Sequence, residues 1–253
     1  MISIGEVKAQ LQAACENELP AFVTQYEGDS RSGVQKCVEA ARKRMESLAK
    51  ERQRTEKLWE YERSYGSYSY ICGIDEAGRG PLAGPVVAGA VILPKDCDLL
   101  YINDSKQLSE KKREELYTKI MECALCCGIG YASPQRIDEI NILQATYEAM
   151  REAVGKLNPR PDLLLNDAVT IPQVSIRQVP IIKGDAKSIS IGAASIVAKV
   201  TRDRLMVQYD EVYPAYGFAA NKGYGAQMHI EALKKYGPCP IHRKTFITHF
   251  CEV

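Results

Sequence analysis

The sequence predicts an α/β domain built on a mixed sheet. Two strand-like stretches, residues 71–76 and 86–93, follow one another closely across a Gly/Pro-rich turn, which predicts a meander. Two later apolar stretches, 162–167 and 174–182, alternate with long helical patterns. Such alternation is typical of sheets whose strands are connected by helices, so we expect one mixed sheet covered by helices.

The elements between these strands can be placed from local signals. Ser109 is a suitable N-cap for a helix over 110–127, and residues 128–133 are short and strand-like. Pro134 begins a further helix, and Asn141 opens the clearest amphipathic pattern of the chain. From Ser188 a long helix rich in small residues is expected to pack closely, most simply against the sheet.

Residues 1–68 differ from the rest of the chain. Val7, Leu11 and Ala14 recur at helical spacing, and a longer helix with alternating charges is expected over 34–61. We interpret residues 1–68 as a small helical N-terminal extension and residues 69–253 as the main domain. The charged face of the extension is either solvated or helps to hold a polyanion.

The composition is that of an ordinary globular chain. Of its 253 residues, 45% are hydrophobic and 26% are charged, enough for one sizeable core and a small extra domain. We find no apolar stretch of membrane-spanning length and no signal-peptide pattern, so we expect a cytoplasmic protein without a membrane span. The nine cysteines lack the spacing of a disulfide framework, and the group Cys123, Cys126 and Cys127 indicates buried packing rather than zinc binding.

Two adjacent acids, Asp75 and Glu76, end the first predicted strand. Neighbouring residues of a strand point to opposite faces, so both acids can line one surface only if the backbone bends after Asp75. Gly78 and Gly80 would allow such a bend. On these residues alone, a metal site and a solvated strand end followed by an ordinary turn remain open alternatives.

Further acids favour the metal site. Asp167 and Asp185 also fall at or just beyond the ends of predicted strands, as Asp75 does. In open α/β sheets the carboxyl edge is where ligands bind, so these acids and Glu76 are expected to converge there. Clustered carboxylates repel one another, and a divalent cation such as Mg²⁺ or Mn²⁺ would relieve that repulsion.

The charge distribution is uneven. The whole chain carries a net charge of +1, which says nothing for nucleic acid, but residues 171–253 hold eleven Lys and Arg against six Asp and Glu. This basic third could form a phosphate-facing surface, although a solvated face is the simpler interpretation.

Several motifs in a fixed order make the pattern specific. They are Asp75-Glu76-Ala-Gly-Arg-Gly-Pro, Asp104-Ser-Lys, Asp167-Ala168, Lys183-Gly-Asp185-Ala-Lys-Ser, Ala193-Ala-Ser-Ile-Val-Ala-Lys-Val-Thr-Arg-Asp203, Asn221-Lys-Gly-Tyr224-Gly and His242-Arg243-Lys-Thr-Phe246. With these motifs, residues 71–250 resemble bacterial ribonuclease HII. Two positions depart from the family pattern: Asn166, where an apolar residue is usual, and Gly192, where Ala is common.

The resemblance implies a fold and an activity. The fold is a ribonuclease H-like mixed five-stranded sheet flanked by helices, preceded by the helical extension that some members carry. The activity is that of an endonuclease that cuts the RNA strand of RNA/DNA hybrids. It also cuts on the 5′ side of single ribonucleotides in duplex DNA, leaving a 5′-phosphate and a 3′-hydroxyl. The family resemblance further suggests a monomer acting in DNA replication and repair.

Carried over by motif, the resemblance also implies site residues. Asp75, Glu76, Asp167 and Asp185 are expected to be the catalytic carboxylates that bind two Mg²⁺ or Mn²⁺ ions.

Substrate recognition is assigned by the same resemblance. The loop Gly78-Arg79-Gly80 is expected to recognise the 2′-hydroxyl, and Tyr224 to pack near the ribose; a plain turn and an ordinary core or surface tyrosine are the alternatives. The lysines Lys106, Lys183 and Lys187 are either phosphate contacts or solvated loop residues.

Three other functions are weighed against this one. A non-catalytic nucleic-acid-binding protein leaves the acids unexplained, because carboxylates repel phosphate. A nucleotide-binding protein is disfavoured because the glycine loop has neither Rossmann nor P-loop spacing. The type III branch of ribonuclease H is the third. We assign no catalytic role to the histidines, and His242-Arg243 is either packed inside or faces phosphate.

Overall fold

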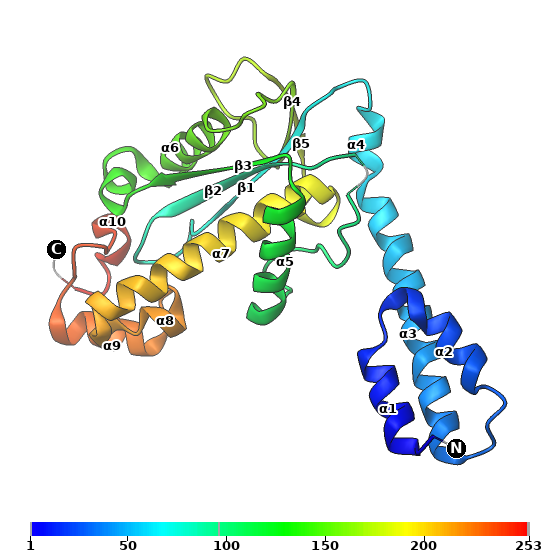
Figure 1. Ribbon diagram of the computed structural model, residues 1–253. Coiled ribbons are helices and arrows are strands. Elements are labelled where there is room, and N and C mark those ends of the chain that lie inside the picture. The colour runs from blue at the N-terminus through cyan, green and yellow to red at the C-terminus, as the bar shows by residue number, and fades with distance from the viewer. Residues whose placement is uncertain (1, 96, 252–253) are drawn as a thin grey trace. The chain divides into compact units, whose positions relative to one another are not determined.

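A computed structural model describes residues 2–95 and 97–251 of the chain (Figure 1). The chain forms two compact units, Met1–Lys57 and Leu58–Val253, which we describe separately. Among the described residues, no helix combines the length and apolar character needed to cross a lipid bilayer.

The first unit is a small helical bundle. Its elements are α1 (Ile4–Ala13), the 3₁₀ turn η1 (Glu16–Glu18), α2 (Leu19–Tyr26) and α3 (Ser32–Leu58). Ser3 and Glu6 cap the start of α1 reciprocally, each side chain accepting the other's main-chain N–H. Val7, Leu19 and Val38 are buried in its core, so the expected helical character of this segment is confirmed.

The second unit holds a five-stranded mixed sheet. The short helix α4 (Glu60–Ser64) precedes strands that lie in the order β3-β2-β1-β4-β5. The pairs β1/β2 and β2/β3 are antiparallel, and β1/β4 and β4/β5 are parallel, which confirms the predicted mixed sheet. The strand bounds are β1 (Ile71–Ala77), β2 (Val86–Ile92), β3 (Cys126–Ala132), β4 (Leu163–Asp167) and β5 (Arg177–Ile181).

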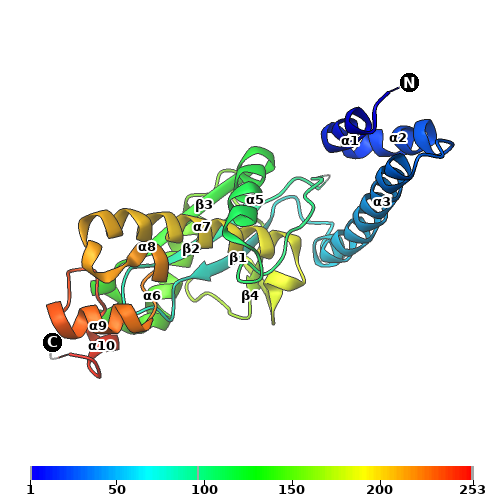
Figure 2. The same ribbon diagram turned by 90° about the horizontal axis from the view of Figure 1, so that it is seen from below.

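Helices connect and cover these strands (Figure 2). The bounds are α5 (Glu110–Cys123), α6 (Pro134–Gly155), η2 (Gly184–Ala186), α7 (Ile189–Val212), η3 (Pro214–Tyr216), α8 (Phe218–Asn221), α9 (Gln227–Tyr236) and α10 (Lys244–Ile247). Asn141, at φ 66°, interrupts α6, which accounts for the two helix starts expected there. The helix expected over 110–127 ends early, because Cys126 and Cys127 pair with β2 instead.

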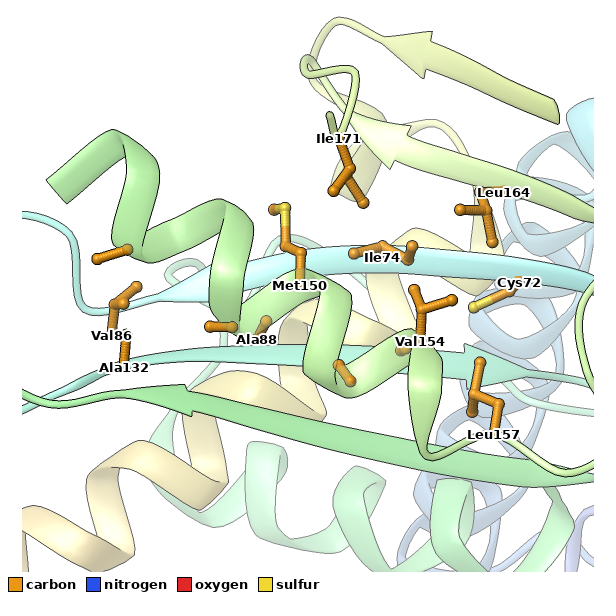
Figure 3. Packing of buried hydrophobic residues seen from close by; sticks show 14 of the residues in the cluster. Cys72, Ile74, Val86, Ala88, Ala132, Met150, Val154, Leu157, Leu164 and Ile171 are labelled. Atoms are coloured by element: carbon orange, nitrogen blue, oxygen red, sulfur yellow. The ribbon is translucent and has the colours of Figure 1, made fainter. Parts of the chain in front are cut away.

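The two faces of the sheet carry different helices. On one face, Ile74, Ala88 and Met150 belong to an apolar cluster between the strands and α6 (Figure 3). On the other face, α7 runs so close to β1 and β2 that no side chain fits at Gly73 or Gly89. A Cβ added to Gly73 would lie 2.0 Å from the Ser190 carbonyl carbon, and one on Gly89 would lie 2.5 Å from the Ala194 oxygen. The expected close packing of α7 on the sheet is therefore confirmed.

Two buried histidines link the C-terminal elements. The Nε2 atoms of His229 and His242 lie 2.9 Å apart, and His242 Nδ1 accepts the N–H of Cys239 at 2.9 Å. At the other end, His229 Nδ1 lies 2.8 Å from the main-chain carbonyl oxygen of Tyr224 and donates to it. One assignment of the ring protons satisfies all of these hydrogen bonds: both rings are neutral, with the proton on Nε2 of His242 and on Nδ1 of His229.

This chain of neutral rings predicts that stability depends on pH. Burial lowers the pKa of both histidines, and burial together with His229 lowers the pKa of His242 to about 4. Both groups therefore stabilise the fold fully above the unfolded pKa of about 6.5, and their contributions fall as the pH drops below it. The contribution of His242 is lost as the pH approaches its folded pKa of about 4. Urea unfolding at pH 7.5 and 5.0 should show the stability gap between wild type and His242→Gln narrowing by on the order of 1–2 kcal/mol at pH 5.0. A gap that stays constant contradicts this assignment.

Candidate metal centre and substrate surface

Three aspartates meet at one edge of the sheet. Asp75 lies near the end of β1, Asp167 is the last residue of β4, and Asp185 lies in η2, directly after β5. Because these three strands run parallel, their carboxyl ends share an edge. One carboxylate oxygen from each aspartate lies within 4.8 Å of the other two. The expected convergence of these three acids is therefore seen in the structure.

Local contacts fix two of the three carboxylates. Asp167 Oδ1 accepts the N–H of Gly184 at 2.7 Å, which joins the end of β4 to η2. The Asp75 carboxylate accepts the N–H of Glu76 at 2.8 Å, and the Ser195 hydroxyl on α7 lies close enough to lower the pKa of Asp75. Ser195 Oγ in turn lies 2.9 Å from Ser105 Oγ. Sequence analysis could not predict that Ser195 lies beside Asp75, since the two residues are far apart along the chain.

The departure from the family pattern at Gly192 has a packing reason. A Cβ at this position would lie 2.6 Å from Ile102 Cγ2 and 2.9 Å from the Asp185 carbonyl oxygen. Glycine therefore lets α7 approach the turn that carries Asp185. The other departure, Asn166, is fully buried and donates to Gln178 Oε1 at 2.7 Å and to the Val169 carbonyl at 3.1 Å.

The electrostatics of the cluster favour a cation. Burial, Glu76 and Asp167 raise the pKa of Asp75 well above its usual value. Burial raises the pKa of Asp185, and Asp167 and Asp104 add to that rise. Both shifts mean that the ionised acids are destabilised by desolvation and by one another. Three oxygen donors that repel in this way match what a hard divalent cation requires, so the triad can hold a metal ion.

Glu76 lies at the margin of this cluster. The β1/β2 ladder continues regularly through Asp75, Glu76 and Ala77, so the backbone does not bend between the two acids. Glu76 is not part of the group whose oxygens lie within 4.8 Å of one another. Its Oε1 lies 3.4 Å from Arg79 Nη1, while burial raises its pKa and Asp167 adds a smaller rise. The structure thus brings three of the four predicted acids together and places Glu76 within electrostatic reach.

The glycine loop and Tyr224 form one surface. Gly78 has φ +93°, a conformation that favours glycine, and the Arg79 side chain is 45% exposed. A Cβ on Gly80 would lie 3.9 Å from Cε1 of Tyr224, so this loop and the half-exposed tyrosine ring are neighbours. Residues from the two motifs therefore meet although the sequence separates them widely.

The predicted lysines are all exposed near the acids. Lys106 is close enough to lower the pKa of both Glu76 and Asp185. Lys183 precedes Asp185 by two residues in a left-handed conformation, and Lys187 follows it. Positive side chains thus surround the acidic edge.

Two fully buried arginines support the glycine loop. Arg202 on α7 donates to the carbonyls of Pro85, Ala83 and Lys222 at 3.0, 3.0 and 2.8 Å. Arg243 donates to the carbonyls of Gly78, Arg79 and Gly84. Of the two interpretations left open for His242-Arg243, the structure supports internal packing.

A weak signal could have revealed Arg202. It continues the buried stripe Ser195, Ala198 and Met206 at helical spacing, where a charged residue is unexpected. For Arg243 the sequence offers no comparable pattern, because its neighbours form only short elements.

A sheet in this order, with aspartates gathered at the ends of its parallel strands, defines the ribonuclease H-like class of nucleases. The family model for ribonuclease HII matches residues 72–252, and that for the ribonuclease HII N-terminal domain matches residues 3–66. The chain belongs to the ribonuclease HII family of endoribonucleases, which cleave RNA in RNA/DNA hybrids.

Individual relatives agree with this membership. The chain is 65% identical over 246 residues to ribonuclease HII of Lachnoclostridium phytofermentans, covering 97% of both proteins. It is 50% identical over 247 residues to ribonuclease HII of Clostridioides difficile, again covering 97% of both.

Solved structures share the fold. Ribonuclease H2 from Pyrococcus horikoshii is 31% identical with a TM-score of 0.59, covering 70% of this chain and 93% of that one. The ribonuclease HII of Archaeoglobus fulgidus, solved in complex with PCNA, is 29% identical with a TM-score of 0.60, covering 70% and 94%. A ribonuclease HIII structure at 17% identity shows a shared fold alone. The match of residues 72–252 to the ribonuclease HII model favours type II over the type III alternative.

The repulsion within the triad predicts how a metal affects stability. We take a Kd of about 1 mM for Mg²⁺, so that 10 mM is a tenfold excess and adds about 1.4 kcal/mol to the free energy of unfolding. The wild type should then melt about 3 °C higher in 10 mM Mg²⁺ than in EDTA. Asp75→Asn should remove most of this increase, and it should be at least as stable as wild type in EDTA because it removes a buried charge. Calorimetry of both proteins, with the exposed Glu39→Gln as control, measures the effect. An equal Mg²⁺ response in Asp75→Asn contradicts it.

Proposed function

We propose that this chain, besides cleaving RNA in hybrids, incises duplex DNA on the 5′ side of single embedded ribonucleotides and leaves a 5′-phosphate and a 3′-hydroxyl. One observation carries the proposal: the aspartate triad lies at the same sheet edge as exposed lysines and the surface made by the Gly78–Gly80 loop and Tyr224. A phosphate and a ribose could therefore be held beside a metal-binding cluster.

Mg²⁺ or Mn²⁺ is the proposed cofactor. Asp75, Asp167 and Asp185 would hold it, since their oxygens are close together, and Glu76 would contribute from the margin. When bound, such ions activate water for attack on phosphorus and stabilise the departing 3′ oxygen. The protein's own part is to hold the carboxylates in place, through the N–H of Gly184 for Asp167 and the N–H of Glu76 for Asp75.

Recognition of the ribose is proposed for the Gly78–Gly80 loop and Tyr224. At the target position, an RNA-containing duplex differs from DNA by the 2′-hydroxyl, so the reader must approach the sugar closely. Glycine at 78 and 80 leaves the main chain accessible, and the Tyr224 ring beside Gly80 supplies an apolar wall. Arg79, Lys106 and Lys183 are proposed phosphate contacts, which position the duplex without selecting its sequence.

The remaining expectations are also proposals. We propose a monomer, because one chain supplies the whole candidate site, and a cytoplasmic location, where its duplex substrates lie. We propose a domain boundary after residue 68, which lies in the gap between the two family-model matches, whereas the two compact units divide earlier, after Lys57. A non-catalytic binder is disfavoured, since clustered aspartates without a metal would repel the phosphates of a duplex.

Cleavage of a duplex that contains one ribonucleotide tests the proposed activity. Wild type should cut it in Mg²⁺ and not in EDTA. Asp167→Asn should lower the rate at least 1,000-fold, because the cluster loses a charged ligand, while the far-ultraviolet circular dichroism stays that of wild type. Glu39→Gln serves as the control that should keep full activity. Full activity of Asp167→Asn would remove the triad from the mechanism.

The role of Arg79 can be tested separately. Arg79→Ala should weaken binding of the same duplex about tenfold, because an exposed charge facing phosphate is lost, and should make binding less sensitive to salt. Titrations at 50 and 200 mM KCl measure both effects, with Arg204→Ala as a matched control on the surface between α5 and α7. Unchanged affinity and salt dependence would argue against a phosphate contact at Arg79.

A further inference from the structure

Arg243 holds the glycine loop from inside the protein. Its guanidinium, fully buried, donates Nε to the Gly84 carbonyl and Nη1 to the Arg79 carbonyl, each at 2.9 Å, and Nη2 to the Gly78 carbonyl. Among the described residues no carboxylate forms an ion pair with it. A charged group kept in the interior by three main-chain oxygens and the Phe246 ring, without a carboxylate, is a costly arrangement that serves to fix those oxygens.

The orientation of these carbonyls determines the outer side of the loop. In a planar trans peptide the C=O and the next N–H point in opposite directions. Because the Gly78 and Arg79 carbonyls point inward to Arg243, the N–H groups of Arg79 and Gly80 point away from it. Within residues 2–95 and 97–251, neither N–H has a hydrogen-bond acceptor. The loop therefore presents two successive donors outward.

His242, the neighbour of Arg243, reaches the other half of the surface. Its ring donates through Nε2 to His229, which donates through Nδ1 to the carbonyl of Tyr224. Both histidines are packed against the stacked rings of Tyr216 and Phe218, which shield these hydrogen bonds from water.

Main-chain contacts join the two halves directly. The N–H groups of Leu82 and Ala83 both donate to the Gly223 carbonyl, at 2.8 and 3.3 Å. The Arg243 N–H donates to the Leu82 carbonyl at 2.9 Å. The residue that orients the glycine loop is thus part of the same framework as the turn before Tyr224.

We propose that the dipeptide His242-Arg243 is a positioning bracket for substrate selection. Arg243 sets the peptide planes of the Gly78–Gly80 loop, and His242, through His229, sets the main chain of Tyr224. The bracket touches neither substrate nor metal; it fixes the spacing between the two groups that face the ribose. This inference rests on the function proposed above, in which that surface recognises a ribonucleotide.

The test compares binding of two duplexes, identical except that one holds a single ribonucleotide. Binding is measured in a cleavage-deficient Asp167→Asn background, and selectivity is the ratio of the two Kd values. Arg243→Lys, which cannot serve three carbonyls at fork geometry, and His229→Gln, which lacks a donor at the Nδ1 position, should each lower selectivity at least fivefold. His229→Asn, whose amide can still donate to Tyr224, should lower it less than His229→Gln does.

A packing variant separates positioning from stability. Leu233 lies in the buried cluster that also holds Tyr216 and Phe218, and its side chain forms no hydrogen bond. Leu233→Ala should therefore lower the melting temperature, while selectivity stays within twofold of that of the background protein. All variants are measured below their melting temperatures. If His229→Gln and Arg243→Lys show the same selectivity as Leu233→Ala, the proposed bracket is overturned. Absence of selectivity in the background protein itself would instead overturn the proposed recognition of the ribonucleotide.

Discussion

The close packing of α7 against β1 and β2 is the constraint on which the rest of the structure depends. Gly73 and Gly89 let the backbone of α7 contact the sheet, and this contact fixes the distance between α7 and the strands. Ser195 therefore lies beside Asp75, and Arg202, two turns later, reaches the carbonyls of Ala83 and Pro85, which follow the glycine loop. One helix thus supports both the acids and the surface beside them.

The site combines two electrostatic environments over a short span. Burial, together with the nearby Asp167, raises the pKa of Asp75 and of Asp185 at the sheet edge, while exposed Lys106 and Lys183 face solvent around them. A phosphate alone would be attracted by these lysines and repelled by the aspartates between them. A divalent cation in the centre reverses that repulsion, so metal binding and substrate binding are expected to reinforce each other.

Sequence analysis predicted the sheet and the convergence of Asp75, Asp167 and Asp185, because strand ends follow from local patterns and parallel strands share an edge. It did not resolve the position of Glu76, which depends on whether the ladder stays regular. It also missed the contacts of Arg243 and the His229 and His242 pair, because their partners are distant in sequence or main-chain atoms, which leave no residue pattern.

The hydrogen bonds from Arg243 to the loop at 78–84 span about two thirds of the chain. Contacts of such sequence separation form late, because the loop between their ends must close first. During synthesis, β1 and its acids emerge long before the residue that orients the neighbouring peptide groups. A nascent chain can therefore assemble much of its sheet while the surface proposed to distinguish ribose from deoxyribose is still incomplete.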